Sequence, residues 1–366
     1  MIRGDNIAFH NYAPKLMDKL LSLGYFRSGK SMFHSPVTFI DGIANSTIRT
    51  RQTLAIHQLS KSSRKLLAKN NRIFTHKLVP LDLDKEILEL YDVYRTECFK
   101  GELNGELSEW LDGSLENELY NTQICKIYFE DKLVAASFVD LGLESMASIM
   151  GIYHPDFSKY SMGIYSMLVE VEYGKKMDLI YYYPGYILSA SPRFEYKKKV
   201  GNLEYKSFDS REWKALETLE MESFFVEKTQ QRLSEVKSCL EEFKIESEIF
   251  SYPLFTWSTY PVDASLLEQY FFLRISVDLF DTLHIIVVYD ILRNGYKINL
   301  VNSIGPASST WQEFKNYYPE DGNWLDTILI QSASKLEQDP TVLPIIIISM
   351  LRTIRDKIKL EELDPT

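Results

Sequence analysis

The order of apolar segments between residues 123 and 183 constrains the fold more than any other feature of the chain. Segments rich in β-branched and aromatic residues are predicted as strands, and they cover residues 123–129, 133–140, 145–153 and 179–183. Between the last two strands, helical spacing predicts a helix from Ser161 to about Lys176. A helix that joins two strands packs on a sheet, so we expect an α/β (α+β) chain.

Hairpin, strand, helix and strand, in this order, are typical of the core of GNAT-type acyltransferases. In that fold the helix after the third strand presents its N-terminus to a phosphate, because free N–H groups and the helix dipole attract anions. The pattern therefore predicts a GNAT-like core. This expectation comes from fold analogy, and the chemistry has to come from particular residues.

Charge is distributed unevenly along the 366 residues. The first 80 residues contain 13 Lys and Arg against 3 Asp and Glu, although the whole chain has a net charge of −10. Such a basic segment either forms a phosphate-binding face or docks on the acidic remainder. Later in the chain, a charged helical segment at 215–243 and strands at 270–304, with a turn at 293–296, predict a separate α+β domain. We therefore divide the chain into a basic half-domain (1–80), a GNAT-like transferase domain (81–213) and an accessory domain of unknown role (214–366).

Residues 24–31, GYFRSGKS, match the phosphate-binding loop pattern G-x-x-x-x-G-K-[ST] letter for letter. Such a loop needs a buried strand before the glycine turn and a helix that starts at the Lys-Ser pair. Here helically spaced apolar residues precede Gly24, which suits a glycine that ends a helix. Pro36 and β-branched residues follow, and they favour an extended segment. Because this order is reversed, we do not expect a phosphate-binding loop.

A cationic cluster lies between residues 49 and 72. Ser60 is placed to cap a short helix whose exposed positions are nearly all Lys or Arg. The cluster either binds phosphates or is an ordinary solvated face. Its candidate phosphate-binding residues are Arg49, Arg51, Lys61, Arg64, Lys65 and Lys69.

Five motifs, in order across residues 12–213, resemble the arginyl- and leucyl-tRNA–protein transferases. The first, Gly-Tyr-Phe-Arg-Ser-Gly at 24–29, is similar to the signature G-[FWY]-R-R-S-G and follows a helical segment that carries Tyr12 and Leu16. The others are 59–70, similar to F-x-x-S-[KR]-S-Q-[RK]-R-x-x-[AR]-[KR]-N; 133–140, similar to L-[IV]-A-V-[AS]-x-x-D; 160–165, similar to S-L-G-x-[YL]; and 183–186 with 196–197, similar to Y-L-G-Y and M-x-Y-K.

The chain departs from this family in three places. Residues 33–49 hold none of the cysteines that the family places after its signature for metal or iron–sulfur binding. Phe26 replaces an Arg of the signature, and residues 97–101 lack the Arg-His pair of the family's R-H-x-x-G segment. The three cysteines of the chain also lie too far apart for metal-ligand spacing. We therefore expect no metal and no cofactor other than aminoacyl-tRNA as co-substrate.

The resemblance implies a transferase of two fused GNAT-like halves that moves arginine or leucine from tRNA to an amine, such as a protein or peptide N-terminus. The ester is already activated, so the protein has to position two substrates and take a proton from the amine. Asp140 is our first candidate base and Glu170 the second, although a carboxylate at a strand end about as often satisfies backbone N–H groups.

The cationic cluster would grip the tRNA backbone. Arg27 and Lys197 would recognise an acidic acceptor or terminal phosphates, and Tyr186 would stack on the terminal adenine. The full set of candidate substrate-binding residues is Arg27, Ser28, Gly29, Ser161, Gly163, Tyr186, Tyr196 and Lys197.

Two other functions are compatible with the same fold. A GNAT-type acyl-CoA N-acyltransferase needs a pyrophosphate loop Q/R-x-x-G-x-[GA], of which residues 159–163 supply only Gly163. A non-catalytic tRNA- or RNA-binding or scaffold protein could retain the fold without the cysteine and Arg-His elements. We expect a cytoplasmic protein with no membrane partner, because the sequence shows no signal peptide and no apolar run long enough to cross a bilayer.

Overall fold

The structure is a computed structural model of the chain. It describes residues 5–8, 11, 13–40, 43–98, 105–112, 119–207, 210, 212–220, 224–251, 270–277, 282–303, 328–333 and 336–363. Tyr12 and most of the segment aligned with R-H-x-x-G, at 99–101, lie outside the described residues.

Two compact units make up the chain. Asn6–His34 and Thr47–Leu219 form the N-terminal unit, whereas Met1–Asp5, Ser35–Ser46 and Glu220–Thr366 form the C-terminal unit. The N-terminal unit thus combines residues from both predicted transferase segments, and the three-part domain division stays a prediction.

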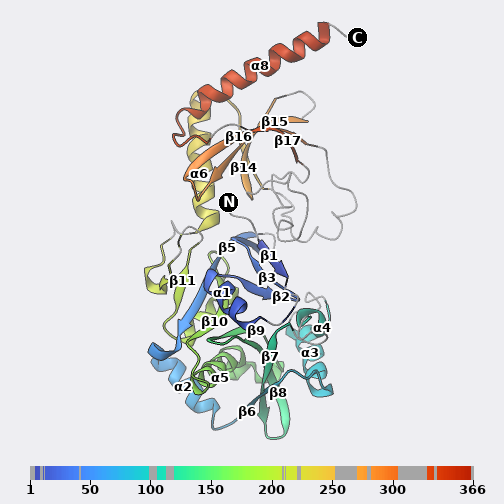
Figure 1. The fold of residues 1–366 in the computed structure, drawn as a ribbon, viewed down its shortest axis with the longest axis vertical. Helices are drawn as coiled ribbons and strands as arrows, with labels where there is room; N and C mark the ends of the chain where they lie inside the picture. Colours follow the sequence, from blue (N-terminus) through green and yellow to red (C-terminus); the bar gives the residue numbers. More distant parts are fainter. Residues whose placement is uncertain are drawn as a thin grey trace. The chain divides into compact units, whose positions relative to one another are not determined.

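The main sheet has the strand order β12-β11-β5-β10-β9-β8-β7-β6 (Figure 1). The bounds are β5 Ile43–Thr53, β6 Thr75–Pro80, β7 Asn121–Phe129, β8 Lys132–Leu141, β9 Ser145–Tyr153, β10 Tyr181–Leu188, β11 Glu204–Lys206 and β12 Lys214–Ala215. Neighbours pair antiparallel, except that β9 and β10 run parallel. Helix α5 (Met162–Lys176) connects this parallel pair. The predicted hairpin, strand, helix and strand are therefore confirmed as β7, β8, β9, α5 and β10.

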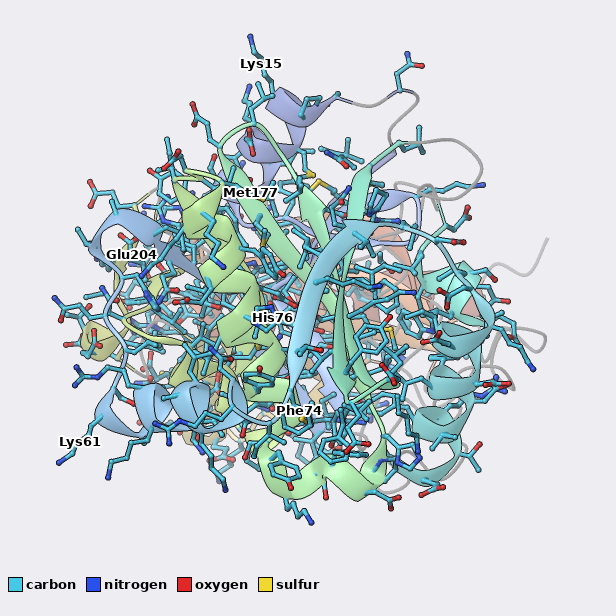
Figure 2. All side chains as sticks on the ribbon, turned by 90° about the horizontal axis from the view of Figure 1, so that it is seen from below. Lys15, Lys61, Phe74, His76, Met177 and Glu204 are labelled. Carbon is cyan, nitrogen blue, oxygen red and sulfur yellow. The ribbon has the colours of Figure 1, made fainter. Side chains whose placement is uncertain are left out.

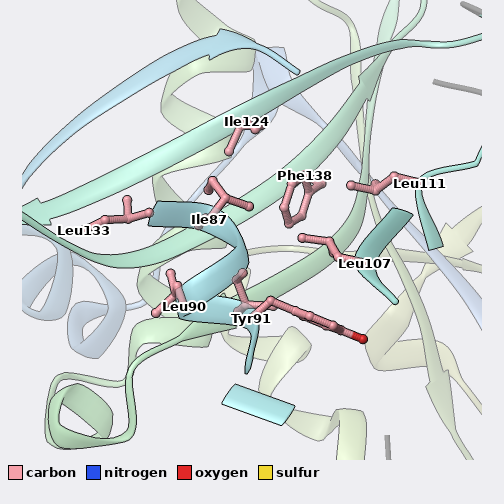
Figure 3. Close-up of a cluster of buried hydrophobic side chains, with 10 residues drawn as sticks. Ile87, Leu90, Tyr91, Leu107, Leu111, Ile124, Leu133 and Phe138 are labelled. Atoms are coloured by element: carbon pink, nitrogen blue, oxygen red, sulfur yellow. The ribbon is translucent and has the colours of Figure 1, made fainter. Parts of the chain in front are cut away.

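Helices cover both faces of the central strands. Strand β8 is buried along almost its whole length, which explains its continuous apolar sequence. On one face Ile87 and Leu90 of α3 (Lys85–Cys98) pack with Phe138 of β8 (Figure 3). The other face holds a second cluster, in which Tyr165 and Val169 of α5 pack with Val134. Successive residues of β8 point to opposite faces, so this one strand supplies both clusters.

The segment that matches a phosphate-binding loop forms a helix followed by a hairpin. Helix α1 (Pro14–Leu23) ends at Gly24, whose φ of 93° is left-handed, as expected for a glycine after a helix. Strands β2 (Phe26–Ser28) and β3 (Ser31–His34) then pair, and β1 (Asp5–Ala8) completes a three-stranded sheet of order β1-β3-β2. No helix starts at the Lys-Ser pair, which confirms that the motif is not a phosphate-binding loop.

The remaining elements of the N-terminal unit are short. Helix α2 (Lys61–Asn70) begins at Ser60, whose hydroxyl accepts a hydrogen bond from the N–H of Ser63, so the predicted cap is confirmed. The others are α4 (Leu107–Trp110) and the 3₁₀ segments η1 (Leu54–Ile56), η2 (Pro155–Tyr160), η3 (Pro192–Val200) and η4 (Leu216–Thr218).

The C-terminal unit has an antiparallel sheet of order β13-β14-β15-β16-β17. Its elements are β4 (Val37–Ile40), which pairs with the start of β5, α6 (Phe225–Glu242), β13 (Glu248–Ser251), β14 (Phe271–Ser276), β15 (Leu283–Asp290), β16 (Gly295–Ser303), β17 (Ile328–Ala333) and α8 (Leu343–Leu363). The predicted turn is confirmed, since Asp290 pairs with Gly295 and Asn294 has a φ of 48°. The predicted helix start at residue 215 is wrong, because Lys214 and Ala215 pair with β11 instead. In the described part of the chain, no helix is both long and apolar enough to span a bilayer.

Candidate functional site

Two adjoining cavities open in the N-terminal unit. The first, about 360 Å³, is lined largely by apolar and aromatic side chains, among them Met17, Phe26, Met32 and Trp110; we call it the apolar cavity. The second, about 490 Å³, is lined by several Tyr and Ser residues together with Glu170 and is called the polar cavity. Both are lined by Ser148, Ile149, Met150, Phe194 and Lys197.

The cavities lie where β9 and β10 separate. Parallel pairing of the two strands stops at Ala147 and Tyr183, although both strands continue. Strand β10 shifts register before Gly185 and goes on pairing with β5. The freed segments line the cavities, Ser148 to Met150 from β9 and Pro184 to Tyr186 from β10. A ligand site at the carboxyl ends of parallel strands is usual in sheets that contain them.

Glu170 is a buried carboxyl group in the polar cavity. Its side chain comes from α5 and is completely buried. The Tyr182 hydroxyl donates a hydrogen bond of 2.5 Å to Oε2, whereas Oε1 accepts no hydrogen bond of standard geometry from the described residues. Burial raises the pKa of Glu170 to about 7, against the opposing effects of nearby hydroxyl groups and of Lys197. A carboxyl group with this pKa is suited to accept a proton near neutral pH.

Lys197 belongs to η3 and lines both cavities. Its ammonium group donates to the carbonyl of Tyr186 at 3.1 Å and lies 4.7 Å from the ring centre of Phe194. Burial lowers the pKa of Lys197 to about 8, and the charge of Glu170 partly offsets this shift. A Cβ atom on Gly185 would lie 2.8 Å from Nζ of Lys197, so the glycine leaves room for the ammonium group.

The N-terminus of α5 forms another part of the polar cavity. Ser161 has a left-handed φ of 54° and links η2 to the helix. Its carbonyl accepts from the N–H groups of Ile164 and Tyr165, and the first helical turn with Gly163 lines the cavity. The positive end of the helix dipole therefore favours an anion here.

Arg27 and Asp140 form a buried ion pair. Nη1 of Arg27 lies 2.7 Å from Oδ1 of Asp140 and also donates to Thr122, which itself hydrogen-bonds Asp140. The other donors of Arg27 bind the carbonyls of Gly29, Leu111 and Asp112. A guanidinium has five N–H donors, and all five are used inside the protein. The pair therefore acts as a structural link between β2, β7, β8 and the end of α4. Of the two candidate bases, Glu170 has the environment of a base, and Asp140 is charge-compensated.

The other predicted substrate-binding residues divide between the cavities. Ser28 and Tyr186 line the apolar cavity, and Tyr186 makes edge contacts with the rings of Phe26 and Phe194. Tyr196 lines the polar cavity, as do Ser161 and Gly163. Gly29 lies in the turn between β2 and β3, where it accepts from Arg27.

Sequence reasoning missed Tyr182, Gly185, Arg193 and Phe194, all near the predicted motifs. Gly185 lies within the Y-L-G-Y match, and this motif was the one feature of the sequence that pointed to it as a site residue. The burial of Tyr182 against Glu170 had no sign in the sequence.

Only part of the cationic cluster faces outward. Lys61, Arg64, Lys65 and Lys69 are exposed on α2, and Figure 2 shows Lys61 pointing away from the protein. Arg49 and Arg51, by contrast, lie on β5 inside the main sheet. Arg49 is 2% exposed and donates to the carbonyls of Gly24 and Thr47. Arg51 pairs with Glu204 at 2.8 Å. The structure therefore places these two arginines in the sheet and not on a phosphate-binding face.

Helix α2 is anchored to both segments that flank the polar cavity. Asn70 donates to the carbonyl of Tyr160 in η2, and the Ser63 hydroxyl donates to the carbonyl of Lys199 in η3. The ring of Tyr160 has the ammonium groups of Lys69 and Lys159 within 5.7 Å and 5.3 Å of its centre. We define the cationic face as Lys61, Arg64, Lys65, Lys69 and Lys159; it ends two residues before Ser161.

No metal site is apparent in these surroundings. Among the described residues, no three His, Cys, Asp or Glu side chains are grouped to hold a metal ion. Residues 33–49 also lack cysteine. The expectation of no metal and no cofactor stays a prediction.

Comparison with known proteins identifies relatives of the N-terminal unit. Residues 86–207 match the family model described as arginine-tRNA-protein transferase, C terminus. An aspartate/glutamate leucyltransferase of Campylobacter jejuni is 28% identical over 197 residues, which are 51% of this chain and 78% of that protein. The protein of the same name from Leptospira interrogans is 29% identical over 142 residues, 38% of this chain and 55% of that protein.

Solved structures align more weakly. FemX aligns with a TM-score of 0.35 and 9% identity over 51% of this chain and 65% of that chain. L-PGS from Bacillus licheniformis aligns with a TM-score of 0.33 and 13% identity over 54% of this chain and 65% of that chain. The fold assignment rests on the strand order of the chain itself.

The family model and the curated relatives agree on one group of proteins. The matched residues 86–207 include both candidate bases, Lys197 and the first turn of α5. Through this region the chain is similar to the aminoacyl-tRNA–protein transferases.

Proposed function

We propose that the chain is an aminoacyltransferase that moves an amino acid from aminoacyl-tRNA to the N-terminal amine of a protein or peptide. The observation that carries this proposal is the pair of cavities that share a wall at Lys197 beside the buried Glu170. The transfer needs a site for the tRNA end beside a site for the amino acid that it carries, and a proton acceptor where the two sites meet.

The tRNA would bind along the cationic face of α2 and place its 3′ end in the polar cavity. Exposed lysine and arginine side chains attract the phosphate backbone without reading its sequence. The first turn of α5 would hold a terminal phosphate, and Tyr196 would stack on the last base. Aminoacyl-tRNA is made in the cytoplasm, so we place the protein there.

The apolar cavity would hold the side chain of the donated amino acid. Asp140, which lines this cavity, is neutralised by Arg27, and Lys197 adds a positive charge to the cavity wall. An arginine side chain would find no free counter-charge among these lining residues, whereas a leucine side chain would be buried favourably. We therefore propose leucine as the donated residue. The names of the relatives suggest acceptors that begin with Asp or Glu.

Glu170 would take the proton from the attacking amine. The free amine is the nucleophile, and a base whose pKa is about 7 can accept its proton at physiological pH. This assigns the base to the second of the two sequence candidates. The ion pair of Asp140 would keep β2 and α4 in place around the apolar cavity.

A label-transfer assay tests the proposal. The purified chain is incubated with total tRNA charged with labelled leucine or arginine and with peptides that begin with Asp, Glu, Lys or Ala. We expect leucine to pass to Asp and Glu peptides, and the Glu170→Gln variant to lose this activity. Retention of tRNA without transfer would support a non-catalytic RNA-binding protein, and turnover of acetyl-CoA would support an acyl-CoA N-acyltransferase. Either result would overturn the proposal.

A further inference from the structure

The ribose oxygen that leaves the tRNA ester needs a proton. When the amine nitrogen bonds to the ester carbon, the carbon–oxygen bond to the ribose breaks and its electron pair moves to that oxygen. An alkoxide is a poor leaving group, so a proton donor at this point lowers the barrier. The donor has to lie between the site of the tRNA end and the site of the acyl side chain.

Lys197 occupies this position. It lines both cavities, and its ammonium group binds the carbonyl of Tyr186 with one of three N–H donors. In the described part of the chain, no carboxylate lies within ion-pair distance of it. Two N–H bonds therefore remain to meet a substrate atom at the shared wall.

We propose that Lys197 is the catalytic residue that protonates the departing ribose oxygen, an inference that rests on the proposed function. Glu170 takes a proton from the amine as the carbon–nitrogen bond forms. Lys197 gives a proton to the ribose oxygen as the carbon–oxygen bond breaks. The products are a peptide bond and tRNA with a free hydroxyl group. One proton then returns from Glu170 to Lys197, directly or through water, and the site is restored.

The surroundings of the two groups suit this exchange. Burial raises the pKa of Glu170 to about 7 and lowers the pKa of Lys197 to about 8. The two values are close, so moving a proton from the acid to the amine costs little at the end of the cycle. An exposed lysine, with a pKa near 10.4, would be a weaker acid.

Gly185 is a positioning residue in this arrangement. Its φ of 94° lies in the left-handed region, and a Cβ atom there would approach Nζ of Lys197 to 2.8 Å. A side chain at this position would displace the ammonium group from the shared wall. The register shift of β10 lies next to Gly185, and the following residue, Tyr186, provides the carbonyl that binds Lys197.

A comparison of two donors tests the proposal. The first is leucyl-tRNA, and the second is the p-nitrophenyl ester of leucine, whose leaving group departs without a proton. The variant Lys197→Met is compared with wild type and with Lys132→Met, a change of an exposed lysine at the start of β8. We expect Lys197→Met to lose about 10²–10⁴-fold in rate with leucyl-tRNA and little with the p-nitrophenyl ester. Lys132→Met should match wild type with both donors.

Two results would overturn the inference while leaving the proposed function intact: an equal loss with both donors, which indicates that Lys197 only shapes the site, or an unchanged rate with leucyl-tRNA. Absence of transfer from leucyl-tRNA by wild type would overturn the proposed function and the inference together. If wild type does not accept the p-nitrophenyl ester, the pH profile decides. Residual activity of Lys197→Met should then lack the fall above pH 8, and persistence of that fall would exclude the proton donor.

Discussion

Glu170 and Lys197 are the two side chains whose ionisation is most relevant to the proposed chemistry. Burial moves the carboxyl pKa up to about 7 and the ammonium pKa down to about 8. Perturbed groups of this kind concentrate at functional sites, although structural ion pairs also produce them. Here the ion pair of Arg27 and Asp140 provides the structural contrast, since it is fully hydrogen-bonded within the protein.

The rate should have a narrow pH optimum. Glu170 has to be ionised to act as a base, so kcat/KM rises through about pH 7, and Lys197 has to be protonated, so the rate falls through about pH 8. Burial raises the pKa of the neighbouring groups that could also titrate, namely Cys125, Tyr182, Tyr186 and Tyr196. Initial rates from pH 5 to 10 test this prediction, and a flat profile would contradict it.

Ionisation of the buried Glu170 should lower the stability of the protein as pH rises through about 7. Its pKa is raised from 4.5 to about 7 on folding, so its stabilising effect is complete below pH 4.5 and is lost as pH rises through 7. Glu170→Gln should therefore increase the free energy of unfolding at pH 8, by up to about 3 kcal/mol, while activity is lost. Urea unfolding at pH 5 and pH 8 measures this gain. The gain should be smaller at pH 5, and an equal difference at both values would contradict the cause.

Gly185→Ala should reduce activity more than its effect on folding explains. The left-handed backbone disfavours alanine by roughly 1–2 kcal/mol, and the added methyl group displaces the ammonium of Lys197. We expect kcat to fall, because the proton donor moves away from the shared wall of the two cavities. The melting temperature is measured on the same sample. If the variant keeps the wild-type kcat, the side chain of Lys197 moves away from the new methyl group without any effect on catalysis, and the prediction is contradicted.

At the scale of elements, helix α2 combines a local signal with a tertiary role. Its cap and its cationic positions follow from the sequence, and its hydrogen bonds to η2 and η3 place it beside the polar cavity. The same comparison explains why Arg49 and Arg51 do not share its role. They lie on β5, which pairs with β10 on one side and β11 on the other; Arg49 is buried and Arg51 is half-buried in an ion pair with Glu204.

Replacing Lys61, Arg64, Lys65 and Lys69 with Gln should lower the affinity for tRNA. The affinity should also depend less steeply on salt concentration. Each phosphate contact contributes roughly 0.7–0.9 to the slope of log K against log salt, so the slope should fall by about 3 if all four side chains bind. Filter binding from 50 to 200 mM salt measures it. The control replaces Lys85 and Lys132, which are exposed elsewhere on the same unit. An unchanged slope would place the tRNA on another surface.

At the scale of the whole molecule, the site is built from distant parts of the chain. Arg27 and Asp140 are separated by 113 positions in sequence, and Arg51 and Glu204 by 153. The apolar cavity is formed only when the β2–β3 hairpin, the central strands and η3 pack together. The net charge of −10 gives no sign of the cationic face, because the face is confined to α2 and the neighbouring η2.

The sequence by itself determined the elements that rest on local physics. Helix caps, turn glycines and apolar periodicity act over a few residues, and they predicted α1, α2, the β7–β8 hairpin, β9, α5 and the turn before β16. The start of α6 was missed, because pairing of Lys214 and Ala215 with β11 overrides a helical pattern. Four of the residues proposed from the sequence, Lys197, Glu170, Ser161 and Gly163, line one cavity, and their roles stay predictions.

Only the tertiary structure decided the surroundings of each charged residue. Asp140 and Glu170 are both carboxylates at the ends or faces of apolar elements, and the sequence ranked Asp140 first. The difference between them is the partner: a guanidinium from β2 neutralises Asp140, whereas Glu170 is buried and accepts a hydrogen bond from a tyrosine hydroxyl. Desolvation and charge compensation depend on groups that lie far away in the chain. A local sequence pattern cannot contain this information, because the partners come together only in the folded chain.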